Sequence, residues 1–360
     1  MPEFTLDELE PGARNLLINC AGAQPGDKVL LVGEQGENLY FEPELCRDVA
    51  LIAESLGMRP TVILAKPVKN AAEFPDNVRH EMEIADQIIF FSRLGDQVRF
   101  SLDAGNKKTV MTYTLDRSYL ASPFASADFT MMKRMHDALL DVVLNAKSYT
   151  ITAANGTNLH GKIHAIGKDA VSEFALELFP VMIFPPVNCY QLNGKLVIDH
   201  FVTSSSTNAY EGSTLVMDSP VMVTVVDSRI TDFKGPDDLV EKFKVQLIKA
   251  AAVTGGDPYL INSWHTGINP NTYYKGDPYG DLELWGTVAY GSPRYTHIHA
   301  AGIDPGDAAF HFMDATIAFD GQVLWDEGRF VFIDRPEIQA MMNIDQRALL
   351  NSAVRHSIGM

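Results

Sequence analysis

The chain has 360 residues, of which 46% are hydrophobic and 21% are charged, an ordinary composition for a compact globular protein. Its formal net charge of −17, without any run of Lys or Arg, argues against nucleic acid and an anionic membrane surface as partners. Because a single hydrophobic core rarely extends beyond ~250–300 residues, we expect two domains.

The N-terminal stretch and the cysteines bear on cellular location. The opening residues MPEFTLDELEPG are acidic, which is not typical of a signal or transit peptide. No apolar run reaches the ~18 residues that a transmembrane helix needs. Cys20, Cys46 and Cys189 are scattered without a CxxC pattern, so they indicate neither a disulfide framework nor a zinc finger. We therefore expect a cytoplasmic protein with reduced thiols.

Strands and helices alternate through residues 1–147. The run DKVLLVGE predicts a strand, PELCRDVALIAESLG a helix with Pro in its first turn and Gly after its end, and RPTVILAKP a second strand. Such a βαβ unit places its two strands in parallel. The alternation continues through EMEIADQIIFFS, KKTVMTYTL and the helical FTMMKRMHDALLDVVLNA. We expect an α/β N-terminal doubly wound scaffold domain over residues 1–147.

The glycines of the loop VGEQGEN follow the first predicted strand, at a place where phosphates often bind. The loop has neither the GxGxxG pattern nor a Walker lysine, so we expect no nucleotide cofactor.

Residues 148–360 change to short alternating runs with turn signals between them, such as SYTITAANGTNLHGKI and SPVMVTVVDSRITDFKG. The pairs Asn193-Gly194 and Asp320-Gly321 predict hairpin turns. One helix is expected within DDLVEKFKVQLIKAAAV, whose apolar residues recur every three or four positions. The second domain is thus predicted to be a β-rich α+β C-terminal domain.

The stretch YGSPRYTHIHAAG places two histidines one residue apart. On a strand, His297 and His299 share a face, so their two imidazoles can bind one metal ion. The alternative is one surface histidine and one hydrogen-bonded core histidine. Histidines concentrate in the β-rich part, which favours the metal site: eight of the ten follow residue 147, namely His160, His164, His200, His265, His297, His299, His311 and His356.

A third ligand is available in INSWHTGINPN, where His265 lies between an apolar run and a turn. The strand-like run ELWGTVAYGSPR separates it from the pair, and a hairpin would bring the two segments together. Three neutral imidazoles leave open positions on Fe(II) or Zn, as a catalytic metal site requires. The alternative for His265 is a hydrogen-bonding residue behind Trp264.

The order of AANGTNLHGKI, FPPVNCYQLNGK, SWHTGINPN, GTVAYG, HIH and FDGQVLWDEG resembles the aminopeptidase T-like family. That family includes dinuclear aminopeptidases and a mononuclear Fe(II) dioxygenase that acts on 2,5-dihydroxypyridine. The resemblance covers most of the chain and implies a metal-dependent enzyme.

The resemblance also implies a ligand set. Counting back from the GxNP turn puts Ser263 at the family's ligand position and His265 two residues later on the same face, and the family's HxD pair becomes His297 and His299. Where the family has Glu, this chain has Ser263 and Asn188, so one metal ion is expected in place of two. A rival placement uses His311 and Asp314 as ligands.

Further site residues are expected around the metal. The segment AANGTNLHGKI resembles the family's Gly-(Ser/Thr)-Asp turn, with Asn158 where the family has Asp and His160 close behind. His160 is expected to act as acid or base, with a solvated loop histidine as the alternative. Tyr290, Arg294 and Tyr295 flank the ligand strand and are expected to bind an anionic or phenolic substrate. The alternative for these three residues is an oligomer interface, where aromatic and Arg residues also occur. We expect a homo-oligomer.

Three functions follow from these expectations. The first is a mononuclear non-haem Fe(II) ring-cleaving dioxygenase that uses O₂ on a small hydroxylated N-heteroaromatic or phenolic compound. The second is a Zn- or Co-dependent amidohydrolase or aminopeptidase, with Glu177 or Asp314 as its carboxylate base. The third is a ligand-binding member of the family without catalytic activity.

Overall fold

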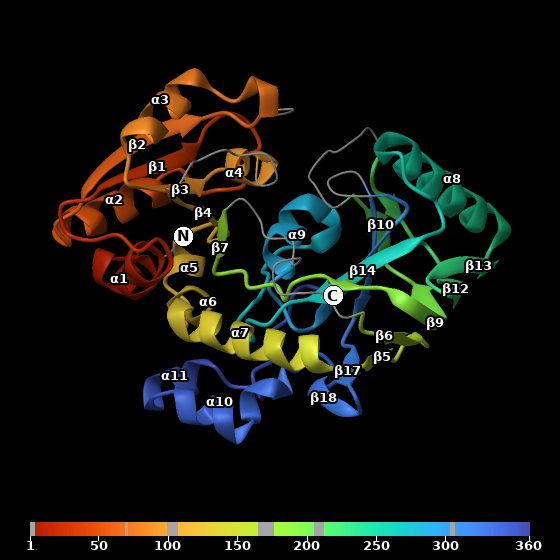
Figure 1. The fold of residues 1–360 in the computed structure, drawn as a ribbon. Helices are drawn as coiled ribbons and strands as arrows, with labels where there is room; N and C mark the ends of the chain where they lie inside the picture. The colour runs from red at the N-terminus through yellow and green to blue at the C-terminus, as the bar shows by residue number, and fades with distance from the viewer. Residues whose placement is uncertain (1–3, 69–70, 99–106, 165–175, 205–211, 303–306) are drawn as a thin grey trace.

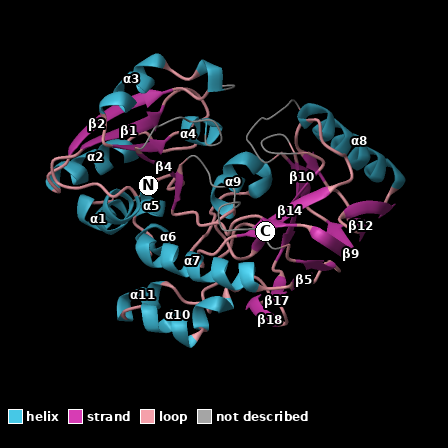
Figure 2. Ribbon diagram, viewed as in Figure 1, coloured by secondary structure: helices cyan, strands magenta, loops and turns pink. Residues whose placement is uncertain are grey.

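The computed structural model contains three β-sheets, with helices around and between them (Figure 1). Figure 2 shows that most helices belong to the N-terminal part and that the strands of the later part form a dense β-rich body. Among the described residues, no helix is long and apolar enough to cross a membrane. The structure describes residues 4–68, 71–98, 107–164, 176–204, 212–302 and 307–360.

The helices of the described residues match the main helices predicted from the sequence. The predicted helix of residues 43–57 is α2, and the predicted helix of residues 237–253 is α8. The helices are α1 (Leu6–Arg14), α2 (Leu45–Ser55), α3 (Asp76–Ile84), α4 (Arg93–Val98), α5 (Arg117–Leu120), α6 (Pro123–Ser126), α7 (Phe129–Asn145), α8 (Asp237–Thr254), α9 (Leu282–Ala289), α10 (Pro336–Met341) and α11 (Ile344–Leu349).

The N-terminal sheet is parallel and has the strand order β2-β1-β3-β4-β7. The chain winds outward from β1 in both directions, as the doubly wound prediction requires. In β1, every residue after Lys28 is buried, which is typical of a central parallel strand covered on both faces. The strands are β1 (Lys28–Glu34), β2 (Arg59–Ala65), β3 (Gln87–Phe91), β4 (Lys108–Thr112) and β7 (Glu177–Phe179).

The β-rich part consists of two antiparallel sheets. The six-stranded sheet has the order β11-β10-β16-β15-β14-β8, and the seven-stranded sheet has the order β13-β12-β9-β6-β5-β17-β18. Their strands are β5 (Ser148–Thr152), β6 (Asn158–Lys162), β8 (Val187–Asn188), β9 (Tyr190–Ile198), β10 (Phe201–Thr203), β11 (Leu215–Val216), β12 (Val221–Val226), β13 (Arg229–Lys234), β14 (Ile261–Thr266), β15 (Tyr295–Ala300), β16 (Ala308–Met313), β17 (Thr316–Phe319) and β18 (Gln322–Trp325).

The two antiparallel sheets pack face to face through aromatic side chains. Trp264 on β14 lies 5.4 Å from Tyr149 on β5 and 6.0 Å from Phe319 on β17, measured between ring centroids. Trp264 is fully buried, so this face of β14 belongs to the core. The opposite face of β14, which carries His265, is therefore turned away from the seven-stranded sheet.

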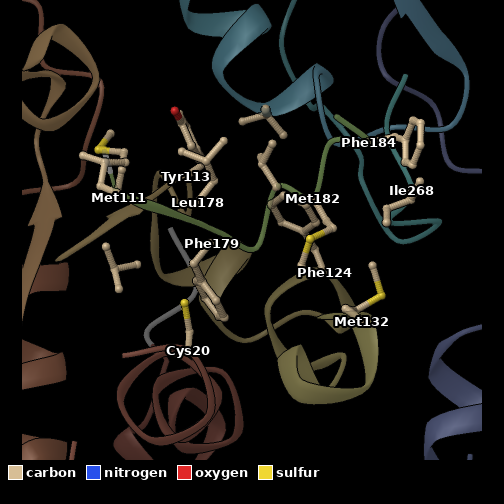
Figure 3. Packing of buried hydrophobic residues seen from close by; sticks show 14 of the residues in the cluster. Cys20, Met111, Tyr113, Phe124, Met132, Leu178, Phe179, Met182, Phe184 and Ile268 are labelled. Atoms are coloured by element: carbon tan, nitrogen blue, oxygen red, sulfur yellow. The ribbon is translucent and has the colours of Figure 1, made fainter. Parts of the chain in front are cut away.

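One strand from beyond residue 147 belongs to the N-terminal sheet. β7 pairs in parallel with β4, and Val110 is the partner of Glu177. Figure 3 shows Leu178 and Phe179 beside side chains of the N-terminal part, with Met182 and Phe184 continuing toward Ile268. These residues belong to one continuous hydrophobic core. The structure is mixed α/β as expected, and the division into domains 1–147 and 148–360 stays a prediction.

Two local predictions were wrong. Asn193 and Gly194 lie inside β9 and form no hairpin turn. A Cβ on Gly194, which has φ +132°, would lie 2.1 Å from the Asn158 carbonyl oxygen, so only glycine allows the backbone of β6 to approach this closely.

The strand-like run after Asp281 is the helix α9, which begins where the Asp281 carboxylate accepts hydrogen bonds from the backbone of Glu283 and Leu284. Asp320 and Gly321 do form the predicted turn, between β17 and β18.

Candidate metal centre

Two neighbouring strands bring three histidines to one face of the six-stranded sheet. His265 on β14 is the cross-strand partner of His297 on β15. His299 lies two positions further along β15 and shares the face of His297, because side chains alternate along a strand. The three residues are 6%, 3% and 8% exposed, so the cluster is almost closed to bulk water.

The three imidazole rings converge closely enough to share one ion. One ligand atom from each of His265, His297 and His299 lies within 4.8 Å of the others. The ring centroids of His265 and His297 are 4.0 Å apart, and those of His265 and His299 are 4.8 Å apart. Within the described part of the chain, this is the one group of three or more His, Cys, Asp or Glu side chains with such spacing.

Hydrogen bonds define the tautomers of two of these rings. His265 Nδ1 lies 3.2 Å from the Phe184 carbonyl oxygen, and His299 Nδ1 lies 2.6 Å from Asp307 Oδ2. Both oxygens can only accept, so each Nδ1 carries a proton and donates it. In the neutral rings, each Nε2 is therefore left with its lone pair.

These two lone pairs face each other. His265 Nε2 and His299 Nε2 are 2.7 Å apart, a repulsive contact between two acceptors unless a cation lies against both. A divalent metal ion fits this requirement, since imidazole nitrogens bind Zn at about 2.0–2.1 Å and also suit Fe(II). A proton shared by the two rings is the other cation that would remove the repulsion. The donor set is thus chemically suited to a metal ion.

Asp307 is a candidate site residue that was not predicted from the sequence. Its carboxylate is 1% exposed and bonds His299 Nδ1, directly before β16. A carboxylate on the outer nitrogen of a metal-ligating histidine orients the ring and increases its basicity. The sequence does hold a signal for Asp307. Because the strand after HIH runs back antiparallel to it, an acidic residue at the start of that strand is a candidate partner for His299.

Of the other predicted site residues, Tyr290 is brought to the cluster. It ends α9, is half-buried, and its ring centroid lies 4.8 Å from that of His297 at an interplanar angle of 62°. At the other end of α9, Tyr40 of the N-terminal part donates a hydrogen bond of 3.1 Å to Oδ1 of the N-cap residue Asp281. In Figure 1, helix α9 lies between the N-terminal sheet and β14, the strand that carries His265.

Arg294 is committed to a different set of contacts. Its Nε and Nη2 atoms donate to the two carboxylate oxygens of Asp314 at 2.8 and 2.9 Å, and its Nη1 atom donates to the carbonyl of His356. Arg355 also pairs with Asp314, at 2.6 Å. These contacts hold the C-terminal segment, and the rival ligand Asp314 is neutralised by two arginines away from the cluster.

The structure does not bring His160 to the cluster. It is exposed on β6, between the buried positions Leu159 and Gly161. Gly161 is paired with Tyr149, whose ring faces Trp264, so the inner face of the seven-stranded sheet lies at these positions. By alternation, His160 points to the outer face, and the width of that sheet separates it from the cluster.

His311, the other residue of the rival placement, extends the row of histidines. It is the cross-strand partner of His297 on β16 and is 1% exposed. Its ring centroid lies 6.3 Å from that of His297, so it adjoins the cluster without joining the three converging nitrogens. Burial lowers the pKa of His311 well below its ordinary value, and the neighbouring His299 and His200 lower it further, so the ring is neutral.

Comparison with known proteins identifies the fold. No family model matches the sequence, and no curated protein matches it. The structure is similar to that of 2,5-dihydroxypyridine dioxygenase from Pseudomonas putida KT2440, with 12% identity, a TM-score of 0.59, and coverage of 91% of this chain and 97% of the other. It also matches AmpT from Thermus thermophilus, with 11% identity, a TM-score of 0.49, and coverage of 90% and 99%.

This chain has the fold of the dioxygenase. The predicted resemblance is confirmed at that level, over nearly the whole length of both chains. At 12% identity, the likeness concerns the fold, so the chemistry of this protein has to be argued from its own residues.

Proposed function

We propose that this protein is a mononuclear non-haem Fe(II) ring-cleaving dioxygenase that acts on a small hydroxylated N-heteroaromatic or phenolic compound. His265, His297 and His299 hold the metal. The observation that carries the proposal is the convergence of three buried imidazoles, two of which have their Nδ1 atoms bonded to oxygen acceptors and their Nε2 atoms turned toward each other. The shared fold with a dioxygenase supports it.

The composition of the cluster favours one metal ion over two. A dinuclear hydrolase holds its two cations with bridging carboxylates. At the corresponding positions this chain has Ser263 and Asn188, which are paired with each other across β14 and β8, and Ser263 is paired with His299. Three neutral imidazoles supply no negative charge to offset the charge of two cations, and imidazole is a ligand that suits iron.

The two carboxylates expected for a hydrolase are occupied elsewhere. Glu177 pairs with Lys108 at 2.9 Å on the edge of the N-terminal sheet. Asp314 is held by Arg294 and Arg355. A metal-dependent hydrolase needs a base to receive a proton from water, and neither group is placed for that role.

The protein's own residues prepare the site. When bound, Fe(II) supplies open coordination positions and one-electron redox chemistry toward O₂ and an electron-rich ring. The Phe184 carbonyl and Asp307 orient His265 and His299, and burial keeps bulk water out. Tyr290 lies beside His297 with a hydroxyl suited to a substrate oxygen. The partners are thus the small-molecule substrate and O₂.

Oxygen uptake tests this proposal. Protein purified without oxygen and loaded with Fe(II), Zn or Co would be given dihydroxypyridines, phenolic acids and aminoacyl amides, with and without O₂. We expect O₂ consumption and ring opening with the Fe(II) form only, lost in His265→Ala and largely retained in Ser263→Ala. Release of amines by the Zn or Co form without O₂, persisting in His265→Ala, would contradict the proposal and favour the hydrolase.

A further inference from the structure

Beside the histidine cluster, a tyrosine and a histidine form a buried stack. Tyr295 precedes His297 by two residues and lies on the same face of β15. The Tyr295 ring is stacked on His311 with centroids 5.1 Å apart and an interplanar angle of 14°, and on His297 at 5.5 Å and 25°. Tyr295 and His311 are each 1% exposed, so this stack is part of the packed interior.

The stack is also enclosed from its sides. Trp285 of α9 meets the Tyr295 ring edge-on at 4.9 Å, and Phe201 of β10 lies 4.3 Å from the His311 ring. Ile358, from the C-terminal segment held by Arg294, is fully buried in the same small cluster. Rings packed in this way have few alternative rotamers, so polar atoms on them are held in place.

A hydrogen-bonded chain runs along this stack toward Tyr290. The Tyr295 hydroxyl bonds His311 Nδ1 and also bonds the Tyr290 hydroxyl. His311 Nε2 is buried and has no hydrogen-bond partner among the described residues. The network is closed at His311, and Tyr290 on its other side lies beside His297 of the histidine cluster.

The buried Nε2 atom of His311 determines which atom donates in each hydrogen bond of this network. If Nε2 of His311 carried the proton, a buried N–H would lack an acceptor, which costs more than a bare lone pair. The proton therefore lies on Nδ1 and is donated to the Tyr295 oxygen. Tyr295 then donates its one proton to the Tyr290 oxygen. As a result, the proton of Tyr290 points away from Tyr295, and no group in the chain needs to change its charge.

We propose that Tyr295 and His311 are positioning residues that direct the Tyr290 hydroxyl as a hydrogen-bond donor toward an oxygen of the substrate ring. Tyr290 would thereby select hydroxylated rings over rings without oxygen. This inference rests on the proposed function, because it requires an aromatic compound bound beside His297.

Anaerobic titration with 4-nitrocatechol, a chromogenic hydroxylated ring, tests the inference on Fe(II)-loaded protein. Because Tyr290→Phe loses the hydrogen bond to the substrate oxygen, it should weaken binding about tenfold, which corresponds to about 1.4 kcal/mol. Tyr295→Phe keeps the stack but loses the hydroxyl, and it should weaken binding about three- to tenfold. The double variant should match Tyr290→Phe, since Tyr295 acts through Tyr290. Bound iron should stay unchanged in all of them.

Two controls separate positioning from general damage. Tyr190→Phe removes a hydroxyl from an exposed tyrosine on β9 and should bind the catechol as the wild type does. Binding of 2-(aminomethyl)pyridine, a chelator of similar size without oxygen, should be the same in the wild type, Tyr290→Phe and Tyr295→Phe. A selective loss for the catechol is an effect that a merely structural role would not produce.

Several outcomes would overturn the inference. Tyr290→Phe or Tyr295→Phe binding within twofold of the wild type would do so, as would loss of iron in Tyr295→Phe or a double variant whose loss equals the product of the single losses. Each of these leaves the proposed function intact if the wild type binds the catechol. A wild-type protein that holds iron and binds no catechol would overturn both.

Discussion

His265 Nε2 and His299 Nε2 lie 2.7 Å apart, although the two residues are 34 positions apart in the sequence. In each ring, Nδ1–H donates to an oxygen, so neither Nε2 can supply a proton to the contact unless its ring becomes charged. The fold thus holds two acceptors together in a buried place, and a cation bound against both nitrogens would stabilise such an arrangement.

Asp307 is expected to strengthen metal binding through His299. Asp307→Asn removes the negative charge beside Nδ1 while keeping the size of the side chain, so it should weaken metal affinity about 10- to 100-fold. Titration against a chelator of known affinity measures the change. Asp326→Asn is the matched control, because Asp326 pairs with Arg329 on a part-exposed turn and should leave the affinity unchanged.

A strong effect of Asp307→Asn on folding with no effect on metal affinity would show that the carboxylate serves packing alone. The variant therefore has to be compared with the wild type both in its thermal transition without metal and in its affinity for the metal.

The ion pairs of Asp314 predict a pH-dependent contribution to stability. Burial alone would raise the pKa of this carboxyl, but hydrogen bonds from Arg294 and Arg355 outweigh burial and lower the pKa below its ordinary value of 3.8. A carboxyl whose folded pKa is lowered stabilises the protein above the unfolded pKa, and this stabilisation is lost as pH falls through the folded pKa. Asp314→Asn should therefore cost about 2 kcal/mol of unfolding free energy at pH 7.

Urea unfolding at several pH values would measure this difference between the wild type and Asp314→Asn. It should be constant between pH 7 and pH 5 and shrink below about pH 4 as the wild-type carboxylate is protonated. A difference that grows as the pH is lowered would refute the assignment.

The histidine cluster could be predicted from the sequence, but the residues that surround it could not be predicted as well. The HxH spacing on a strand places His297 and His299 on one face. His265 joins them because its strand, β14, pairs with β15 and places it opposite His297. Asp307 could not be predicted with the same ease, because its contact with His299 depends on how the chain turns between β15 and β16. Local spacing describes a single strand well, but contacts across a loop depend on tertiary packing.

Two other predictions illustrate the same limit. The run after Asp281 has apolar residues that fit a strand or a helix, and the side-chain cap of Asp281 together with packing against Tyr295 decides for the helix α9. His160 follows a turn that resembles the family's motif, yet strand alternation turns it to the exposed face of β6. Proximity to a motif in sequence does not determine the direction of a side chain.

The turn after β14 should tolerate no side chain at Gly267. A Cβ there would lie 2.1 Å from the carbonyl carbon of Gly291, a backbone atom that cannot rotate away. Gly267→Ala should therefore destabilise the protein by more than about 3 kcal/mol, beyond the usual range for overpacking with flexible neighbours. Gly280→Ala is the matched control, since its Cβ would meet nothing within 4 Å. Thermal unfolding of both variants checks this, and equal transitions would contradict it.

Metal analysis of protein purified without oxygen tests most directly whether the three imidazoles bind one metal ion. Wild type should contain one iron per chain, whereas His265→Ala, His297→Ala and His299→Ala should each contain less than about a tenth of that while remaining folded by circular dichroism. His80→Ala, at an exposed histidine of α3, should keep the full content. Full iron in any of the three cluster variants, or a folded wild type that cannot be loaded with iron, would contradict the account.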